Sequence, residues 1–334
     1  MPKPIARSAG MQPGAVFVDH TTASANVARE LYAAAQALGY APHAAARSLA
    51  GGSSGTVALV IPKAAHLYVD AFLAQLVASI NDQCHRHGLK LLIESTEDEG
   101  REPGGFLQLV RSRRIDGLIV AHLRTTELDH LRRLRDGGIP LVVFGCDLPA
   151  GDGFHAMGDD TWRSARLAVA HLIGLGHRRV AFVNYAQPEF HSTNQRERGW
   201  RQAMDDHGLA IDPAWLAYAD ISAESGYAAT RALLARAVPF TALFAGNDTI
   251  AFGALRALHE AGLRVPQDVA VVGYDDIPLA AFASPPLTTV HSDPIGHGRQ
   301  ALQWLLAQLG RTPAADVEAV AAARLVVRAS CGAR

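Results

Sequence analysis

The stretch Leu263-Arg-Val-Pro-Gln-Asp-Val-Ala-Val-Val-Gly-Tyr-Asp-Asp276 carries the signal that decides the fold. Its β-branched run, residues 269–274, predicts a buried strand, and residues 248–262 before it have the periodicity of a helix. The strand ends on Asp275, at the edge where ligands meet open α/β sheets. A helix, a strand and a polar loop in this order are typical of a βαβ unit.

The same alternation runs through the chain from residue 56 onward. We predict a first series of strands near 56–62, 89–95, 116–120 and 140–144, and a second near 179–184, 214–218, 240–245 and 269–274. A late strand near 322–328 is expected to return to the second series. Helices are expected near 70–87, 103–113, 126–137, 160–175, 194–207, 223–236, 248–262 and 293–309. Two such series in tandem predict an α/β fold with two similar lobes and parallel sheets.

Composition excludes several classes of protein. The 334 residues are 49% hydrophobic and 19% charged, with a net charge of -1, so there is no global bias toward nucleic acid or membrane. No apolar run approaches the ~20 residues that span a bilayer, and no signal-peptide core is present, so a cytoplasmic protein is expected. Cys84, Cys146 and Cys331 have no metal-ligand spacing, and we expect neither a metal nor a cofactor.

No enzyme motif stands in its required context. Residues 51–55, Gly-Gly-Ser-Ser-Gly, match the hydrolase G-x-S-x-G elbow formally, but a strand follows them and a helical segment precedes them, the reverse of that elbow. A flexible linker is the better interpretation. There is no G-x-G-x-x-G in the first βα turn, no P-loop and no HExxH. An α/β enzyme such as a sugar hydrolase or dehydrogenase is therefore the weakest hypothesis.

Four further segments form a series with residues 263–276. They are the hinge-like run Tyr40 to Gly52, the helix-to-strand run Gly174 to Phe182, the strand-turn-helix Phe244 to Leu255, and the crossover Ser284 to Val290. Together, in this order, these motifs resemble the lactose/galactose repressor (LacI/GalR) family. The resemblance implies a two-lobed, periplasmic-binding-protein-like (type I) core preceded by a small all-α helix-turn-helix headpiece.

This resemblance implies a domain organisation. The headpiece and hinge helix would occupy residues 1–50 and the linker 51–55, and the effector-binding core would occupy 56–334. Lobe 1 would comprise about 56–158 plus 291–320, and lobe 2 about 159–290 plus 321–334.

Candidate ligand-binding residues follow the carboxyl ends of the expected strands. Asp275 ends one strand, Asn247 and Asp248 follow another, and Asp160 begins the helix after residues 156–158. Arg196 matches the family arginine that reaches the effector. A carboxylate and a guanidinium converging in a cleft suit the hydroxyls of a sugar. The alternative for each residue alone is a helix cap or a surface ion pair.

The first lobe and two altered positions complete the predicted site. The loop after the first strand, residues 63–72, is expected to supply Asp70 and an aromatic wall through Phe72 or Tyr68. Ile221 and Leu148 stand where family members carry effector-stacking aromatics, which argues against a purine effector.

The headpiece departs from the family pattern. Residues 11–18, Met-Gln-Pro-Gly-Ala-Val-Phe-Val, lack the Thr, Ser and Arg side chains that reach phosphates and bases in the recognition helix. The residues expected at DNA are Gln12 and Val16 there, and Arg47 and Leu49 in the hinge, where Leu49 matches the leucine that wedges into the minor groove.

The resemblance therefore implies a dimeric transcriptional regulator that binds operator DNA under the control of a small sugar-like effector. Of the two directions of regulation, repression is the one expected. The alternative is a cytoplasmic sugar-binding protein of the same ancestry whose specific DNA binding is weakened or lost. The altered run 11–18 favours the alternative, and the retained hinge opposes it.

Overall fold

The computed structural model describes residues 37, 53–62, 70–96, 110, 112, 114–121, 124, 127–144, 154–157, 161–186, 190–311 and 319–333. The chain divides into two units, Met1–Ser54 and Gly55–Arg334, and nearly all of the described residues belong to the second. The predicted DNA contacts Gln12, Val16, Arg47 and Leu49 lie outside the described residues, as does Asp160.

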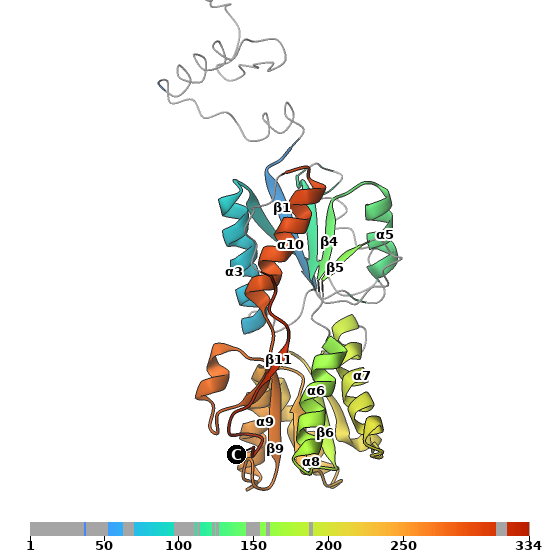
Figure 1. Ribbon diagram of the computed structural model, residues 1–334, viewed down its shortest axis with the longest axis vertical. Helices are drawn as coiled ribbons and strands as arrows, with labels where there is room; N and C mark the ends of the chain where they lie inside the picture. Colours follow the sequence, from blue (N-terminus) through green and yellow to red (C-terminus); the bar gives the residue numbers. More distant parts are fainter. Residues whose placement is uncertain are drawn as a thin grey trace, which may run out of the picture. The chain divides into compact units, whose positions relative to one another are not determined.

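The first sheet has the strand order β2-β1-β3-β4-β5, and all of its pairings are parallel. Its strands are β1 (Thr56–Pro62), β2 (Lys90–Thr96), β3 (Gly117–Ala121), β4 (Leu141–Phe144) and β5 (His155–Met157). Helices α3 (Ala71–Arg86) and α10 (Pro294–Gln308) lie side by side (Figure 1) and share one apolar core with Val57 and Leu59 of β1. Ala58 and Val60 point to the other face, toward α5 (Leu128–Asp136). These elements form lobe 1.

The second sheet has the order β11-β10-β9-β8-β6-β7 and is parallel except for β11, which runs antiparallel to β10. Its strands are β6 (Val180–Tyr185), β7 (Leu216–Ala219), β8 (Ala242–Ala245), β9 (Ala270–Asp275), β10 (Thr288–His291) and β11 (Arg324–Val326). The helices are α6 (Thr161–Gly174), α7 (His191–Asp206), α8 (Ala223–Ala235) and α9 (Asp248–Glu260), with short 3-10 turns η4 (Pro213–Trp215) and η5 (Pro278–Phe282). These elements form lobe 2.

Glycines allow the lobe 2 helices to pack in close pairs. A Cβ at Gly199 of α7 would collide with the carbonyl oxygen of Trp162 and lie 2.7 Å from the Cβ of Ala165, both on α6. A Cβ at Gly253 of α9 would likewise collide with the backbone of Ala223 in α8. The α6–α7 and α8–α9 pairs therefore meet backbone to backbone.

The predicted α/β fold with two lobes and parallel sheets is confirmed. The helices and strands that fall on described residues begin and end within about three residues of their predicted bounds. The strand predicted at 322–328 joins the second sheet as β11, whereas most of the helix expected at 103–113 lies outside the described residues.

Two strands were not predicted. β5 is a three-residue edge strand, and β10 was interpreted only as part of a crossover. β10 reads Thr-Thr-Val-His after two prolines, without the apolar run that marks a buried strand, yet its first three residues are buried between β9 and β11.

The chain passes between the sheets more than once. It leaves the first sheet after β5, returns from β10 to α10, and crosses again from α10 to β11. Among the described helices, none has the length and apolarity to span a bilayer. Within the same residues, no cluster of three or more His, Cys, Asp or Glu side chains is arranged to hold a metal ion.

Candidate functional site

A pocket lies where the carboxyl ends of strands from both sheets meet. Lobe 2 supplies most of its polar side chains, lobe 1 supplies two aromatic rings and an acid, and the β10–α10 crossover supplies a serine. The lining residues are Asp70, Phe72, Phe144, Thr161, Tyr185, Ser192, Arg196, Asn247, Asp275 and Ser292. Of the predicted ligand-binding residues on described positions, five line this pocket: Asp70, Phe72, Arg196, Asn247 and Asp275.

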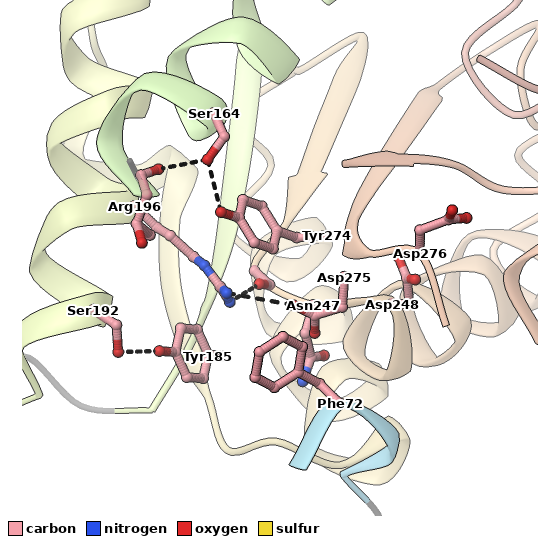
Figure 2. A network of polar contacts seen from close by, with 12 residues as sticks. Phe72, Ser164, Tyr185, Ser192, Arg196, Asn247, Asp248, Tyr274, Asp275 and Asp276 are labelled. Atoms are coloured by element: carbon pink, nitrogen blue, oxygen red, sulfur yellow. Dashed lines mark hydrogen bonds and ion pairs between the residues drawn. The ribbon is translucent and has the colours of Figure 1, made fainter. Parts of the chain in front are cut away.

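Arg196 of α7 enters the pocket between two tyrosine rings (Figure 2). Its guanidinium carbon lies 4.3 Å from the ring centre of Tyr185 and 3.8 Å from that of Tyr274. In the guanidinium plane, one nitrogen donates to the carbonyl of Gly246 and another donates to Asp275 Oδ1 at 3.4 Å. The side chains of Arg196 and Asp275 are only 10% and 8% exposed, so they form an almost fully buried ion pair.

The two tyrosines are themselves anchored by serine hydroxyls. Tyr274 shares a 2.7 Å hydrogen bond with Ser164 of α6, and Tyr185 shares one with Ser192 at the start of α7. Burial raises the pKa of Tyr185, more than the nearby Arg196 charge lowers it. Its hydroxyl is therefore neutral at neutral pH, and the ring serves as a fixed wall beside the guanidinium.

On the lobe 1 side, Asp70 has a structural duty as the N-cap of α3. Its Oδ1 accepts hydrogen bonds from the backbone N–H groups of Phe72 at 2.9 Å and Leu73 at 3.1 Å. The cap orients the first turn of α3, and with it Phe72, whose ring stacks on Phe144 with 6.0 Å between centres. The aromatic wall expected at Phe72 is thus a pair of rings, because Phe144 ends β4 directly beside it.

Asn247 lines the pocket and also caps α9. Its Oδ1 accepts from the N–H of Ile250 at 2.7 Å, and its amide donates to the carbonyl of Ile221 at 3.3 Å. Ile221 itself is buried and does not line the pocket. The cap interpretation and the ligand interpretation of Asn247 are therefore compatible.

Asp248 was predicted as a ligand-binding residue, but its side chain does not line the pocket. It is 0% exposed and lies behind the pocket, accepting from the N–H of Ile277 at 2.8 Å and the hydroxyl of Thr289 at 2.5 Å. Burial raises its pKa to about 7, although these two hydrogen bonds lower it. We therefore leave Asp248 out of the proposed ligand contacts.

The residues that the sequence interpretation missed are mainly hydroxyls and aromatics: Phe144, Thr161, Tyr185, Ser192 and Ser292. Two of them carry a usable signal, since Phe144 and Tyr185 are the last residues of buried parallel strands. The others follow from how the elements are arranged in space.

The charges on the described lining residues do not cancel completely. One guanidinium, Arg196, and two carboxylates, Asp70 and Asp275, line the pocket, which leaves one formal negative charge. Such a pocket offers hydrogen-bond donors and acceptors in fixed directions beside aromatic rings, and it disfavours an added anion.

Comparisons with known proteins agree with this architecture. Residues 169–331 match the periplasmic binding protein-like domain. The HTH-type transcriptional repressor PurR of Haemophilus influenzae (strain PittEE) is 32% identical over 313 residues, which cover 92% of this chain and 90% of the relative. The chain belongs to the LacI family of transcriptional regulators.

Solved LacI-family structures resemble the present one. The transcriptional regulator CelR in complex with cellobiose is 30% identical with a TM-score of 0.71, and 92% of each chain is covered. A sugar-binding transcriptional regulator of the LacI family from Escherichia coli, in complex with phosphate, is 27% identical with a TM-score of 0.71 and covers 83% of this chain and 98% of its own. The family assignment made from the sequence is confirmed.

Proposed function

We propose that this LacI-family chain is a cytoplasmic, homodimeric transcriptional regulator that acts as a repressor. It binds operator DNA under the control of a small neutral sugar or sugar derivative. The effector occupies the pocket between the two lobes. The chain catalyses no reaction, and binding alone produces the response.

The observation that carries the choice of effector is the pairing of Arg196 and Asp275 opposite the stacked rings of Phe72 and Phe144. A sugar ring has C–H groups on its faces, which pack against aromatic rings, and hydroxyls at its edge, which both donate and accept. A guanidinium supplies only donors and a carboxylate only acceptors, so the pair matches both roles of a hydroxyl.

The proposed mechanism couples ligand binding to the arrangement of the lobes. Lobe 1 contributes Phe72 and Phe144 and lobe 2 contributes Arg196 and Asp275, so a ligand that contacts both groups favours one relative orientation of the lobes. That orientation would change the order of the hinge helix expected at residues 43–50, and with it the affinity for DNA.

A thermal-shift screen tests the effector class. The full chain is melted with a panel of neutral mono- and disaccharides that includes cellobiose, with the corresponding sugar phosphates, and with purine bases. We expect at least one neutral saccharide to raise the melting temperature and its phosphorylated form to do so less, because the described lining residues carry one net negative charge. Stabilisation by purines or by sugar phosphates alone would contradict the proposal.

The altered recognition segment, residues 11–18, favours a second candidate, a sugar-binding protein with weak DNA discrimination. We expect the ratio of specific to non-specific DNA affinity to lie at or below the low end of the ~10³–10⁷ range of specific regulators. Selection from random DNA distinguishes the two. A modest consensus supports the regulator, no enrichment supports the sugar-binding protein, and a sharp long palindrome shows that Gln12, Val16 and the hinge suffice.

A further inference from the structure

The loop that presents Asp275 to the pocket has an unusual backbone. Asp275 has φ 106° and Asp276 has φ 54°, so two consecutive non-glycine residues adopt left-handed conformations. Such conformations persist where the surrounding structure holds them in place. The contacts of Asp276, Ile277 and the neighbouring strand β10 show what holds this loop.

One buried carboxylate and one buried hydroxyl bind the loop from behind. Asp248 Oδ2 accepts from the N–H of Ile277 at 2.8 Å, while Asp248 Oδ1 accepts from the hydroxyl of Thr289 at 2.5 Å. The same hydroxyl oxygen accepts from the N–H of Asp276 at 3.4 Å. Both Asp248 and Thr289 are 0% exposed, and neither lines the pocket. Their hydrogen bonds therefore serve the loop and do not contact the ligand.

Glycine at position 273 leaves room for the Asp248 carboxylate to approach the loop. A Cβ at Gly273 would collide with Asp248 Oδ1 and lie 2.9 Å from Leu287 Cδ2, so only glycine lets the carboxylate approach. The N–H of Ser292, at the crossover to lobe 1, donates to the carbonyl of Asp275 at 3.4 Å.

Ionic contacts hold the outer side of the loop. The carboxylate of Asp276 binds Arg328 at 2.7 Å and His291 Nδ1 at 3.0 Å. In Figure 2, Asp248 and Asp276 lie on the other side of Asp275 from Arg196. The loop is thus held from the side opposite the pocket.

We infer that Asp248 and Thr289 are positioning residues: they hold the loop 275–277, in which Asp275 and Asp276 are left-handed, in the geometry that brings the Asp275 carboxylate to Arg196. Without the Thr289 hydroxyl, Asp248 loses a donor, the N–H of Asp276 loses an acceptor, and the loop is free to relax toward negative φ. Asp275 would then turn away from the guanidinium. This role applies to any ligand that Asp275 contacts, and its test uses no ligand, so it can fail or succeed independently of the proposed effector.

A double-mutant cycle measures this role in the full chain. The variants are Thr289→Val, which keeps the side chain's shape and removes the hydroxyl, Asp275→Asn, and the two combined, each unfolded in urea. If Thr289 positions Asp275, Asp275→Asn shifts the urea midpoint clearly less in the Thr289→Val background than in the parent, because the ion pair is already weakened there. Thr289→Ser, which retains the hydroxyl, should leave the parental shift intact.

Thr230→Val is the matched control. Thr230 is also in lobe 2 and 0% exposed, and its hydroxyl donates to Gly226 within α8, away from the loop. Combined with Asp275→Asn, it should give additive shifts. Additive shifts for Thr289→Val as well would overturn the inference. Should Thr289→Val fail to fold, Asp248→Asn replaces it in the cycle, and additive shifts with Asp275→Asn would then overturn the inference instead.

Discussion

The guanidinium of Arg196 is accessible to a ligand only at its edge. Rings cover both of its faces, and in-plane donors already meet Gly246 and Asp275. A ligand must therefore approach it edge-on, and a displaced hydrogen bond has to be replaced, because the group is almost fully buried. The rigid fork makes Arg196 a directional donor, which suits recognition of hydroxyl oxygens at one orientation.

Arg196→Ala and Asp275→Ala should each weaken binding of the best saccharide from the screen by roughly 10- to 150-fold, the equivalent of about 1.5–3 kcal/mol for a lost charge-assisted hydrogen bond. Titration calorimetry gives the affinity and thermal melts give the stability. Arg166→Ala is the control, because it removes an arginine of lobe 2 whose ion pair with Asp206 is exposed. Folded variants that keep parental affinity, with lower melting temperatures, would make the Arg196–Asp275 pair purely structural.

Asp248 predicts a pH dependence of stability. Its pKa is raised by burial to about 7 in the folded protein, whereas the pKa of an unfolded Asp is about 4. The folded state therefore keeps this proton to higher pH than the unfolded state does. The associated stability is fully present below about pH 4 and is lost as the pH rises through about 7.

Asp248→Asn isolates this contribution because an amide does not titrate. The melting temperature of the parent relative to that of Asp248→Asn should fall between about pH 5 and about pH 8. Subtracting the two curves removes the other titrating groups they share. A difference that stays constant across this interval, or grows with pH, would mean that Asp248 is already ionised at the acid end.

Site residues whose position follows from a single helix or strand could be predicted from the sequence. Contacts that combine several helices or strands could not. Asp275 and Asn247, which both line the pocket, were predicted because strand ends and helix starts locate them along the chain. The position of Arg196 between two tyrosine rings was not predicted, because Tyr185 and Tyr274 lie on β6 and β9, which β8 separates in the sheet. Asp248 was predicted to contact the ligand but lies behind the pocket, because adjacent residues at a helix N-terminus point in different directions.

Among the helices and strands, pairs of helices in direct backbone contact limit which substitutions lobe 2 tolerates. Gly199→Ala places a Cβ against the carbonyl of Trp162 and the Cβ of Ala165, neither of which can move without shifting α6. We expect a loss of about 1–3 kcal/mol of unfolding free energy, the usual range for overpacking. Urea unfolding measures it.

Gly174→Ala is the control for the helix pair. Gly174 ends α6, and a Cβ there meets no atom within 4 Å. Because alanine is the better helix former by about 1 kcal/mol, this variant should be as stable as the parent or slightly more so. Equal losses for both substitutions would show that backbone flexibility, and not the contact with α6, decides the outcome at Gly199.

Helices and strands were predictable from the sequence where their own hydrophobic periodicity is clear. Most helices carry an apolar stripe, and Gly176 and Gly262 have the left-handed φ values, 101° and 74°, of residues just past helices. β10 gave no such signal, because its burial comes from neighbours on both sides and not from its own composition. A short strand of threonines becomes visible only through its partners.

For the whole molecule, the proposed division of labour separates DNA contact from ligand contact. Leu49→Ala should weaken operator binding, because it removes the expected minor-groove wedge, and should leave saccharide affinity unchanged, because the pocket lies within the unit Gly55–Arg334. Footprinting titrations and calorimetry on the same preparation check both halves. Parental operator affinity in Leu49→Ala would exclude the wedge.

The return of the chain to lobe 1 has a consequence for synthesis on the ribosome. Ala301, Leu302, Leu305 and Leu306 of α10 complete the core that β1 and β3 begin. Met157 and Gln308, the ends of β5 and α10, are separated by about 150 residues, which take roughly 8–30 s to translate. Throughout that time the nascent lobe 1 carries an uncovered apolar face, so the two lobes finish folding nearly together. The order of the residues along the chain makes the N-terminal lobe wait for the C-terminal one.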